Sequence, residues 1–174
     1  DHRDLHLSIR RQRQMCIRDR VGMVIHRDGA IEPIKERIGQ YKTKYSVDLD
    51  SVMGITDEEK TKMSEDADVI LCAAAAGKEA LSLKHFGKAK NLKVIADVNA
   101  VPPTGVEGLE VNSNNEKIKN TNVLGIGALA VGQIKAQVQH QLLKLMCNSD
   151  KPVFLDFREA YKICLLYTSD AADE

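Results

Sequence analysis

The stretch "LKVIADVNAVPP", residues 92–103, decides the fold because it joins a strand pattern to an abrupt stop. Its apolar run is typical of a parallel strand that is covered on both faces of a sheet. An aspartate, an asparagine and a double proline follow, and a proline cannot donate a hydrogen bond to a strand ladder. Ligands of open α/β sheets lie outside the carboxyl ends of the strands. We therefore expect a ligand contact where this strand ends.

Three other segments have the composition of strands. They are "VGMVIH" at residues 21–26, "YSVDLDS" at 45–51 and "ADVILCAAAAG" at 67–77. The last is continuously apolar and ends in small residues and a glycine, which again favours a strand covered on both faces.

Helical patterns separate these strands. Ile34, Ile38, Tyr41 and Tyr45 recur at helical spacing, and Thr56 with Glu59 forms a capping box that predicts a helix over residues 57–66. We expect further helices over residues 82–90, over 128–146 and from Asp156 onward. The stripe of the long helix consists of Ile134, Val138, Leu142, Leu145 and Met146. This alternation predicts an α/β fold with a doubly wound parallel sheet and flanking helices.

Length and charge restrict the functional classes. The 174 residues suit about one domain, and the 25 basic side chains balance 25 acidic ones, so no net field attracts nucleic acid or an anionic membrane. No apolar run is long enough for a membrane span, and the four cysteines lack the spacing of a metal site. We expect a cytoplasmic protein with a small-molecule or protein partner.

The two ends differ in composition from the interior. Residues 1–20 hold six arginines and no lysine, and both "RQRQMCIRDR" and "CLLYTSDAADE" resemble translated sequencing adapters. The competing interpretation of the first end is a basic arm that binds nucleic acid. We expect residues 1–20 and 164–174 to be non-native or disordered tails, and residues 21–163 to be a truncated domain.

Chemistry-bearing residues gather at three predicted strand ends. His26, Arg27 and Asp28 follow one strand, the alanines and glycine of residues 73–77 follow another, and Asp97, Asn99 and Ala100 follow a third. Each group has a structural alternative: helix packing for the alanines, a solvated turn for the arginine, and a bond within its own loop for the asparagine. The GxGxxG loop of a dinucleotide fold is missing, so either the fold binds no nucleotide or the chain begins after that loop.

Three motifs carry a resemblance to a known family. "IADVNAVPPTGVEGLE", "LGIGALAVGQIKAQVQHQLL" and "KPVFLDFREAYKI" resemble the C-terminal half of the NAD(P)-dependent methylene-tetrahydromethanopterin dehydrogenases, bacterial relatives of methylene-tetrahydrofolate dehydrogenase. The similarity covers residues 21–163. It implies an incomplete Rossmann-like NAD(P)-binding domain without the phosphate loop and without the N-terminal domain that supplies much of the pterin site.

The resemblance also implies roles for individual residues. Arg27 would meet the 2′-phosphate of NADP, although the neighbouring Asp28 leaves NAD open. Lys135 would hold the pterin substrate by a hydrogen bond. The implied cofactor contacts are His26, Arg27, Asp28, Ala74, Ala75, Gly77, Asn99, Ala100, Gly125 and Gly127.

The implied reaction is hydride transfer from methylene-tetrahydromethanopterin to NADP or NAD, which leaves the methenyl form and requires no proton acceptor. The parent enzyme would be a homo-oligomer, and this part of it alone would be inactive. Two alternatives stay open. One is a methylene-tetrahydrofolate dehydrogenase, and the other is a non-catalytic Rossmann-like module that binds a nucleotide.

Overall fold

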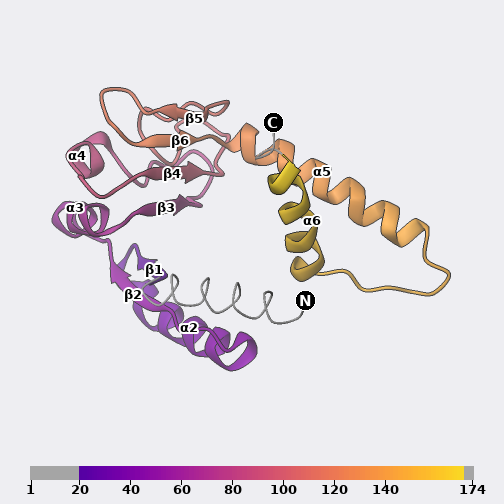
Figure 1. Cartoon of the computed structure of the whole chain (residues 1–174). Coiled ribbons are helices and arrows are strands. Elements are labelled where there is room, and N and C mark those ends of the chain that lie inside the picture. Colours follow the sequence, from indigo (N-terminus) through magenta and orange to yellow (C-terminus); the bar gives the residue numbers. More distant parts are fainter. Residues whose placement is uncertain (1–19, 171–174) are drawn as a thin grey trace, which may run out of the picture. The chain divides into compact units, whose positions relative to one another are not determined.

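A computed structural model describes residues 20–170, with side chains through Leu165. Within the described residues the chain divides into two compact units, and the division falls between Met63 and Ser64 (Figure 1). The predictions for residues 1–19 and 171–174 lie outside the described residues. No helix in the described range is long and apolar enough to cross a membrane.

The first unit contains a parallel pair of strands and a helix. Strand β1 (Gly22–Ile25) pairs with β2 (Asp50–Met53), and Ile25 is buried at the end of β1. A short 3-10 helix η1 (Asp28–Ala30) leads into α2 (Ile31–Tyr45). The first strand and the helix agree with the prediction. The second strand begins later than predicted, because α2 continues to Tyr45 and Ser46 turns the chain with a φ of 56°.

Helix α3 (Asp57–Asp66) has the predicted bounds, and the capping box explains its start. The Glu59 backbone N–H donates to Thr56 Oγ1 at 3.2 Å, and Glu59 Oε2 accepts the Thr56 backbone N–H at 3.0 Å. Two backbone donors at the helix start are satisfied reciprocally, so this boundary is fixed by local sequence.

The second unit contains a four-stranded sheet in the order β3-β4-β6-β5. Strands β3 (Val69–Cys72), β4 (Val94–Asp97) and β6 (Leu124–Ile126) are parallel, and β5 (Asn114–Lys117) is antiparallel to β6. The predicted α/β class, with mainly parallel strands flanked by helices, is confirmed and is consistent with a Rossmann-like fold (Figure 1). Strands β5 and β6 were not predicted.

The core of this unit lies around β4 and the loops beside it. Helix α4 (Leu83–Phe86) is shorter than the predicted helix and buries Phe86 completely. Its start carries a capping box between Ser82 and His85. The other buried apolar side chains are Cys72, Leu81, Leu92, Ile95, Ala96, Val106, Leu109, Ile118, Val123 and Val138.

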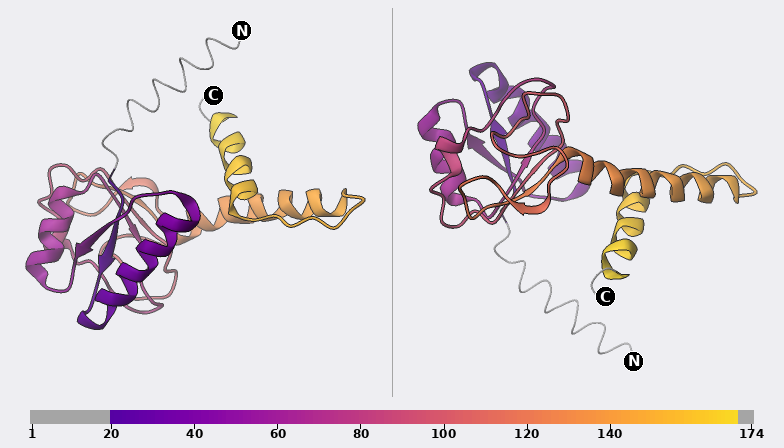
Figure 2. Two further views of the ribbon diagram at one scale, coloured as in Figure 1. Left: turned by 90° about the horizontal axis from the view of Figure 1, so that it is seen from below. Right: turned by 90° about the horizontal axis from the view of Figure 1, so that it is seen from above.

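Helix α5 (Ala128–Cys147) begins where predicted and projects away from the four-stranded sheet, with α6 (Phe157–Asp170) packed against it (Figure 2). Of its predicted apolar stripe only Val138 is buried, whereas Ile134 is 48% exposed.

At the start of α6, the side chain of Asp156 accepts the Arg158 backbone N–H at 2.9 Å. Hydrogen bonds from Arg158 lower the pKa of Asp156 to about 2. The proposed tail from residue 164 onward thus lies in α6 as far as Asp170.

Candidate functional site

The carboxyl end of β4 is organised by Asp97, whose side chain is only 2% exposed. One carboxylate oxygen accepts the Asn99 backbone N–H at 3.0 Å, and the other accepts the Gly105 backbone N–H at 2.7 Å. A buried carboxylate is tolerated where it accepts such hydrogen bonds. Asp97 therefore joins the two ends of the loop formed by residues 98–105, which we call the strand-end loop.

The side chain of Asn99 fixes the middle of the strand-end loop. Its Oδ1 accepts the Val101 backbone N–H at 3.0 Å, and its Nδ2 donates to the Pro103 carbonyl at 3.2 Å. Asn99 is buried and Ala100 is exposed. The structural alternative for Asn99 is thus realised, because both polar atoms of its amide bond within its own loop.

A second loop, residues 73–77, follows β3 and approaches the strand-end loop. The backbone of Gly77 has a φ of +71°, and a Cβ at this position would lie 3.7 Å from the Pro102 carbonyl oxygen. The Val98 backbone N–H donates to the Cys72 carbonyl at 3.1 Å. The structure therefore brings Ala74, Ala75 and Gly77 to the same sheet edge as Asn99 and Ala100.

Small side chains leave the backbone of the loop at 73–77 accessible. Ala75 is exposed and Ala74 is half-buried. A positive φ favours glycine, so the backbone conformation at position 77 explains the glycine there. A flat ligand could lie against this loop without displacing a large side chain.

Cys72 lies beneath the two loops, opposite Asp97 in the register of β3 and β4. Burial raises the pKa of the Cys72 thiol, the backbone N–H of Ala74 opposes this effect, and the negative charge of Asp97 adds to the increase. A Cβ on Gly105 would meet the Cys72 sulfur at 2.7 Å. The contact between these residues therefore requires glycine at 105.

Gly125 and Gly127 have a packing role in the structure. A Cβ on Gly125 would collide with Leu109, and one on Gly127 would collide with the backbone of Glu110 and Val111. Both glycines are buried. Packing within the protein therefore explains why both positions are glycine. A cofactor contact at either position stays a prediction.

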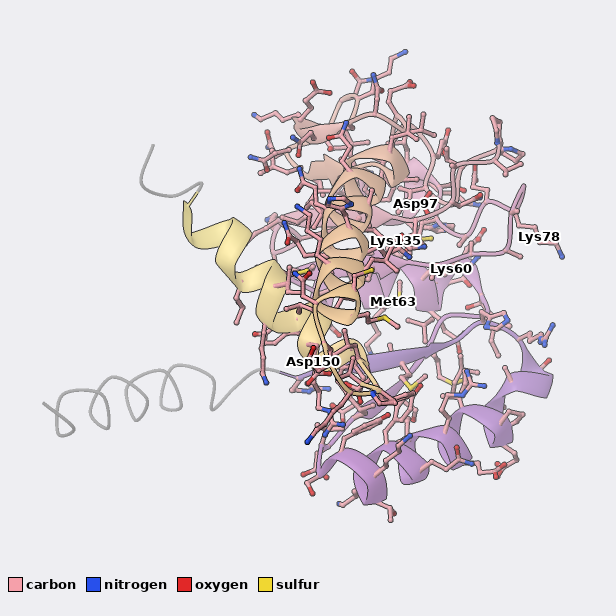
Figure 3. All side chains as sticks on the ribbon, turned by 90° about the vertical axis from the view of Figure 1, so that its right-hand side faces the viewer. Lys60, Met63, Lys78, Asp97, Lys135 and Asp150 are labelled. Atoms are coloured by element: carbon pink, nitrogen blue, oxygen red, sulfur yellow. The ribbon has the colours of Figure 1, made fainter. Side chains whose placement is uncertain are left out.

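Lys135 lies on α5, about two turns after its start, and is exposed (Figure 3). Among residues 20–165, whose side chains the structure describes, no carboxylate pairs with its ammonium group. It is available to a ligand, but nothing in the structure distinguishes it from a solvated lysine.

The remaining predicted cofactor contacts lie in the first unit. His26, Arg27 and Asp28 follow β1 directly and are all exposed. Arg27 has extended backbone and accepts the Ala30 backbone N–H through its carbonyl at 2.9 Å. In the described part of the chain its guanidinium has no carboxylate partner, so it is free to contact an anion.

Sequence reasoning missed the bracing role of Asp97 and its partner at Gly105. The strand pattern places Asp97 at a strand end without assigning it a partner, and it does not single out Gly105. A signal was present, because a carboxylate at a buried strand end needs donors, and a turn with two prolines offers few of its own N–H groups. The residues after Pro103 are therefore the nearest source of backbone N–H donors for the Asp97 carboxylate.

The comparisons with known proteins agree with the motifs. No family model matches the chain. It is 40% identical over 124 residues, 71% of its length, to the NAD(P)-dependent methylenetetrahydromethanopterin dehydrogenase of Methylorubrum extorquens, and spans 42% of that protein. It is 23% identical over 120 residues, 69% of its length, to the Bifunctional protein MdtA of the same organism, and spans 41% of it. The chain thus spans less than half the length of either curated relative.

The resemblance inferred from the three motifs is therefore confirmed: over most of its length, this chain is a relative of an NAD(P)-dependent methylenetetrahydromethanopterin dehydrogenase.

Proposed function

We propose that residues 21–163 supply the cofactor-binding part of a dehydrogenase that transfers a hydride from methylene-tetrahydromethanopterin to NADP or NAD and leaves the methenyl form. The observation that carries this proposal is the 40% identity to a protein named for that activity. The geometry at the ends of β3 and β4 supports it, because ligands of such sheets lie at this edge.

The residues at this edge fit the nicotinamide half of a dinucleotide. The loop at 73–77 offers small side chains, and the strand-end loop presents Ala100 beside it. Gly77 keeps the two loops close, and Asp97 holds the shape of the strand-end loop from below. When bound there, the nicotinamide would accept the hydride.

The contribution of this chain to the reaction would be positioning. Hydride transfer is accelerated by holding two flat partners in reactive contact, and it needs no general base in this reaction. Asp97 and Asn99 would fix the backbone that borders the ring, and Lys135 would donate a hydrogen bond to the pterin. In the first unit, Arg27 would contact the 2′-phosphate of NADP, and Asp28 would contact the ribose of NAD.

A chimeric enzyme tests the proposal. Residues 21–163 would replace the aligned segment of the Methylorubrum extorquens dehydrogenase, and formation of the reduced cofactor would be followed by its absorbance. We expect turnover within about tenfold of the parent enzyme, a change of about 1.4 kcal/mol in the barrier. A chimera that folds, as shown by circular dichroism, but transfers no hydride would contradict the proposal. Methylene-tetrahydrofolate is tested in place of methylene-tetrahydromethanopterin. A higher turnover with the folate would identify the chain as part of a methylene-tetrahydrofolate dehydrogenase.

The proposal extends to the setting of the enzyme. We place the enzyme in the cytoplasm as a homo-oligomer, with residues 21–163 as its cofactor-binding part and with residues 1–20 and 164–174 as non-native sequence. Sequencing the parent gene through both junctions tests this division. Finding the same tails encoded there would contradict it.

A further inference from the structure

A cavity of about 500 Å³ lies at the opposite end of the four-stranded sheet from the candidate cofactor site. It is lined by residues 87–90 together with Leu92, Lys93, Asn122 and Leu124. Leu92 and Lys93 directly precede β4, and Leu124 is the first residue of β6. The cavity is therefore at the amino ends of the parallel strands, and we call it the amino-edge pocket.

The amino-edge pocket is separate from the strand-end loop. Lys93 directly precedes β4 and Asp97 is its last residue. An extended chain advances about 3.3 Å per residue, so about 13 Å of backbone lies between them. A ligand in this pocket would not reach the cysteine, aspartate and asparagine at the carboxyl ends.

Positive charge collects at this pocket although the chain as a whole is neutral. No acidic residue occurs between Glu79 and Asp97, whereas that segment contains Lys84 and the three pocket lysines. Lys93 pairs with Asp68 at 2.8 Å. Within the part of the chain that the structure describes, Lys88 and Lys90 form no hydrogen bond or ion pair.

The remaining lining combines an apolar wall with an amide donor. Leu92 is 4% exposed. Asn122 Oδ1 accepts from Lys117 Nζ at 3.4 Å, which orients the amide and leaves its NH₂ group for another acceptor. An acceptor-rich anion with an attached apolar or flat group matches this set, because lysine ammonium groups and an amide NH₂ are all donors.

We propose that the amino-edge pocket binds a small organic phosphate, with Lys88 and Lys90 as the ligating cations. The volume lies within the range of small-molecule sites, about 300–1,000 Å³. Phosphate oxygens would accept from the two unpaired ammonium groups, and the attached group would lie against Leu92 and Leu124. This inference does not depend on the proposed dehydrogenase activity.

Nuclear magnetic resonance of the 174-residue chain tests the site, with pyrophosphate, ADP and adenosine as the probes. We expect pyrophosphate and ADP to shift the backbone amide signals of Leu92, Lys93 and Leu124 in a saturable way at millimolar concentration, and adenosine to leave them in place. Signals of Asn99 and Gly105 are followed separately, so that binding of ADP at the candidate cofactor site is not counted. Added salt should weaken binding, because the contacts are ionic.

Matched variants distinguish a built site from general attraction to positive charge. The double variant Lys88→Gln with Lys90→Gln should weaken pyrophosphate binding by at least about tenfold, a loss of about 1.4 kcal/mol. Lys162→Gln, on α6, removes one positive charge elsewhere and should leave the affinity unchanged. Equal weakening by Lys162→Gln, unaltered binding by the double variant, or no saturable shift with pyrophosphate would each overturn the proposal.

Discussion

The carboxylate of Asp97 accepts the backbone N–H of Gly105 at 2.7 Å, across eight positions of the chain. With its bond to the Asn99 N–H, this one buried side chain holds both ends of the strand-end loop. Hydrogen bonds to charged groups contribute about 1.5–3 kcal/mol, and leaving a buried donor without a partner costs a similar amount. The shape of the loop therefore depends on a side chain that is itself buried.

Replacing Asp97 by Asn should destabilise the second unit. One carboxylate oxygen becomes an NH₂ group, which cannot accept from a backbone N–H, so one buried donor loses its partner. We expect the free energy of unfolding in urea, followed by circular dichroism, to fall by about 1–3 kcal/mol. Asp150→Asn, at an exposed position (Figure 3), is the control and should change it by less than about 0.5 kcal/mol. Equal stability of the two variants would show that the carboxylate is not needed.

Two glycine substitutions should have opposite effects on stability. In Gly105→Ala the new methyl group would meet the Cys72 sulfur and both Asp97 oxygens at 2.7 to 3.1 Å, and we expect a loss of about 1–3 kcal/mol. Gly132 lies within α5 with nothing within 4 Å of its position for a Cβ, so Gly132→Ala should gain about 0.5–1 kcal/mol. Urea denaturation measures both, and destabilisation by Gly132→Ala would be evidence for an unseen contact on α5.

The parts of the fold that follow from local chemistry were predictable. The capping box of Thr56 and Glu59 set the start of α3, and the apolar runs located β3 and β4. The prediction that β3 is covered on both faces is wrong, because Val69 and Leu71 are exposed. By contrast, β5 has the sequence "NNEK" with all four residues exposed. Strand β6 contains Gly125, which is explained by its tertiary contacts with Leu109 and Ile118. These strands exist because of pairing across the sheet, which no local pattern reveals.

The candidate site was predictable in position and not in detail. Strand ends locate ligand sites, so the sequence alone is enough to place Ala74, Ala75 and Ala100 at one edge of the sheet. The engagement of the Asn99 amide by Val101 and Pro103 depends on how the loop folds back. The same holds for the bond between Asp97 and Gly105, since both partners must be brought together by tertiary structure.

Cys72 should make stability depend on pH in the alkaline range. Burial raises the pKa of its thiol above the ordinary value of 9.0, so the folded chain keeps a proton that the unfolded chain loses. Its contribution to stability is complete below pH 9 and falls as the pH rises through 9 toward the folded pKa. Urea denaturation at several pH values should show a shallower decline for Cys72→Ser than for the unaltered chain. Identical slopes would contradict the prediction.

Arg27 is predicted to select the cofactor in the chimeric enzyme. An arginine makes charge-assisted bonds to a phosphate group that serine cannot replace. Arg27→Ser should raise the KM for NADP by about tenfold or more, about 1.4 kcal/mol, and leave the KM for NAD nearly unchanged. Arg37→Ser, on α2, removes an exposed arginine of the same unit as a control. An equal increase for both cofactors would reduce Arg27 to a turn residue.

Lys135 is predicted to contact the pterin, and its exposure without a carboxylate partner in the described range is compatible with that role. Its hydrogen bond would position the substrate, since a proton acceptor is not required and a close positive charge would disfavour the cationic product. In the chimeric enzyme, Lys135→Met should lower kcat by about a hundredfold or more, the scale of a lost positioning contact, while the Kd for the cofactor stays nearly constant. Lys144 lies near the end of the same helix, and the control variant Lys144→Met should retain full turnover. If Lys135→Met turns over like Lys144→Met, Lys135 is an ordinary solvated lysine, and the pterin is held by other residues.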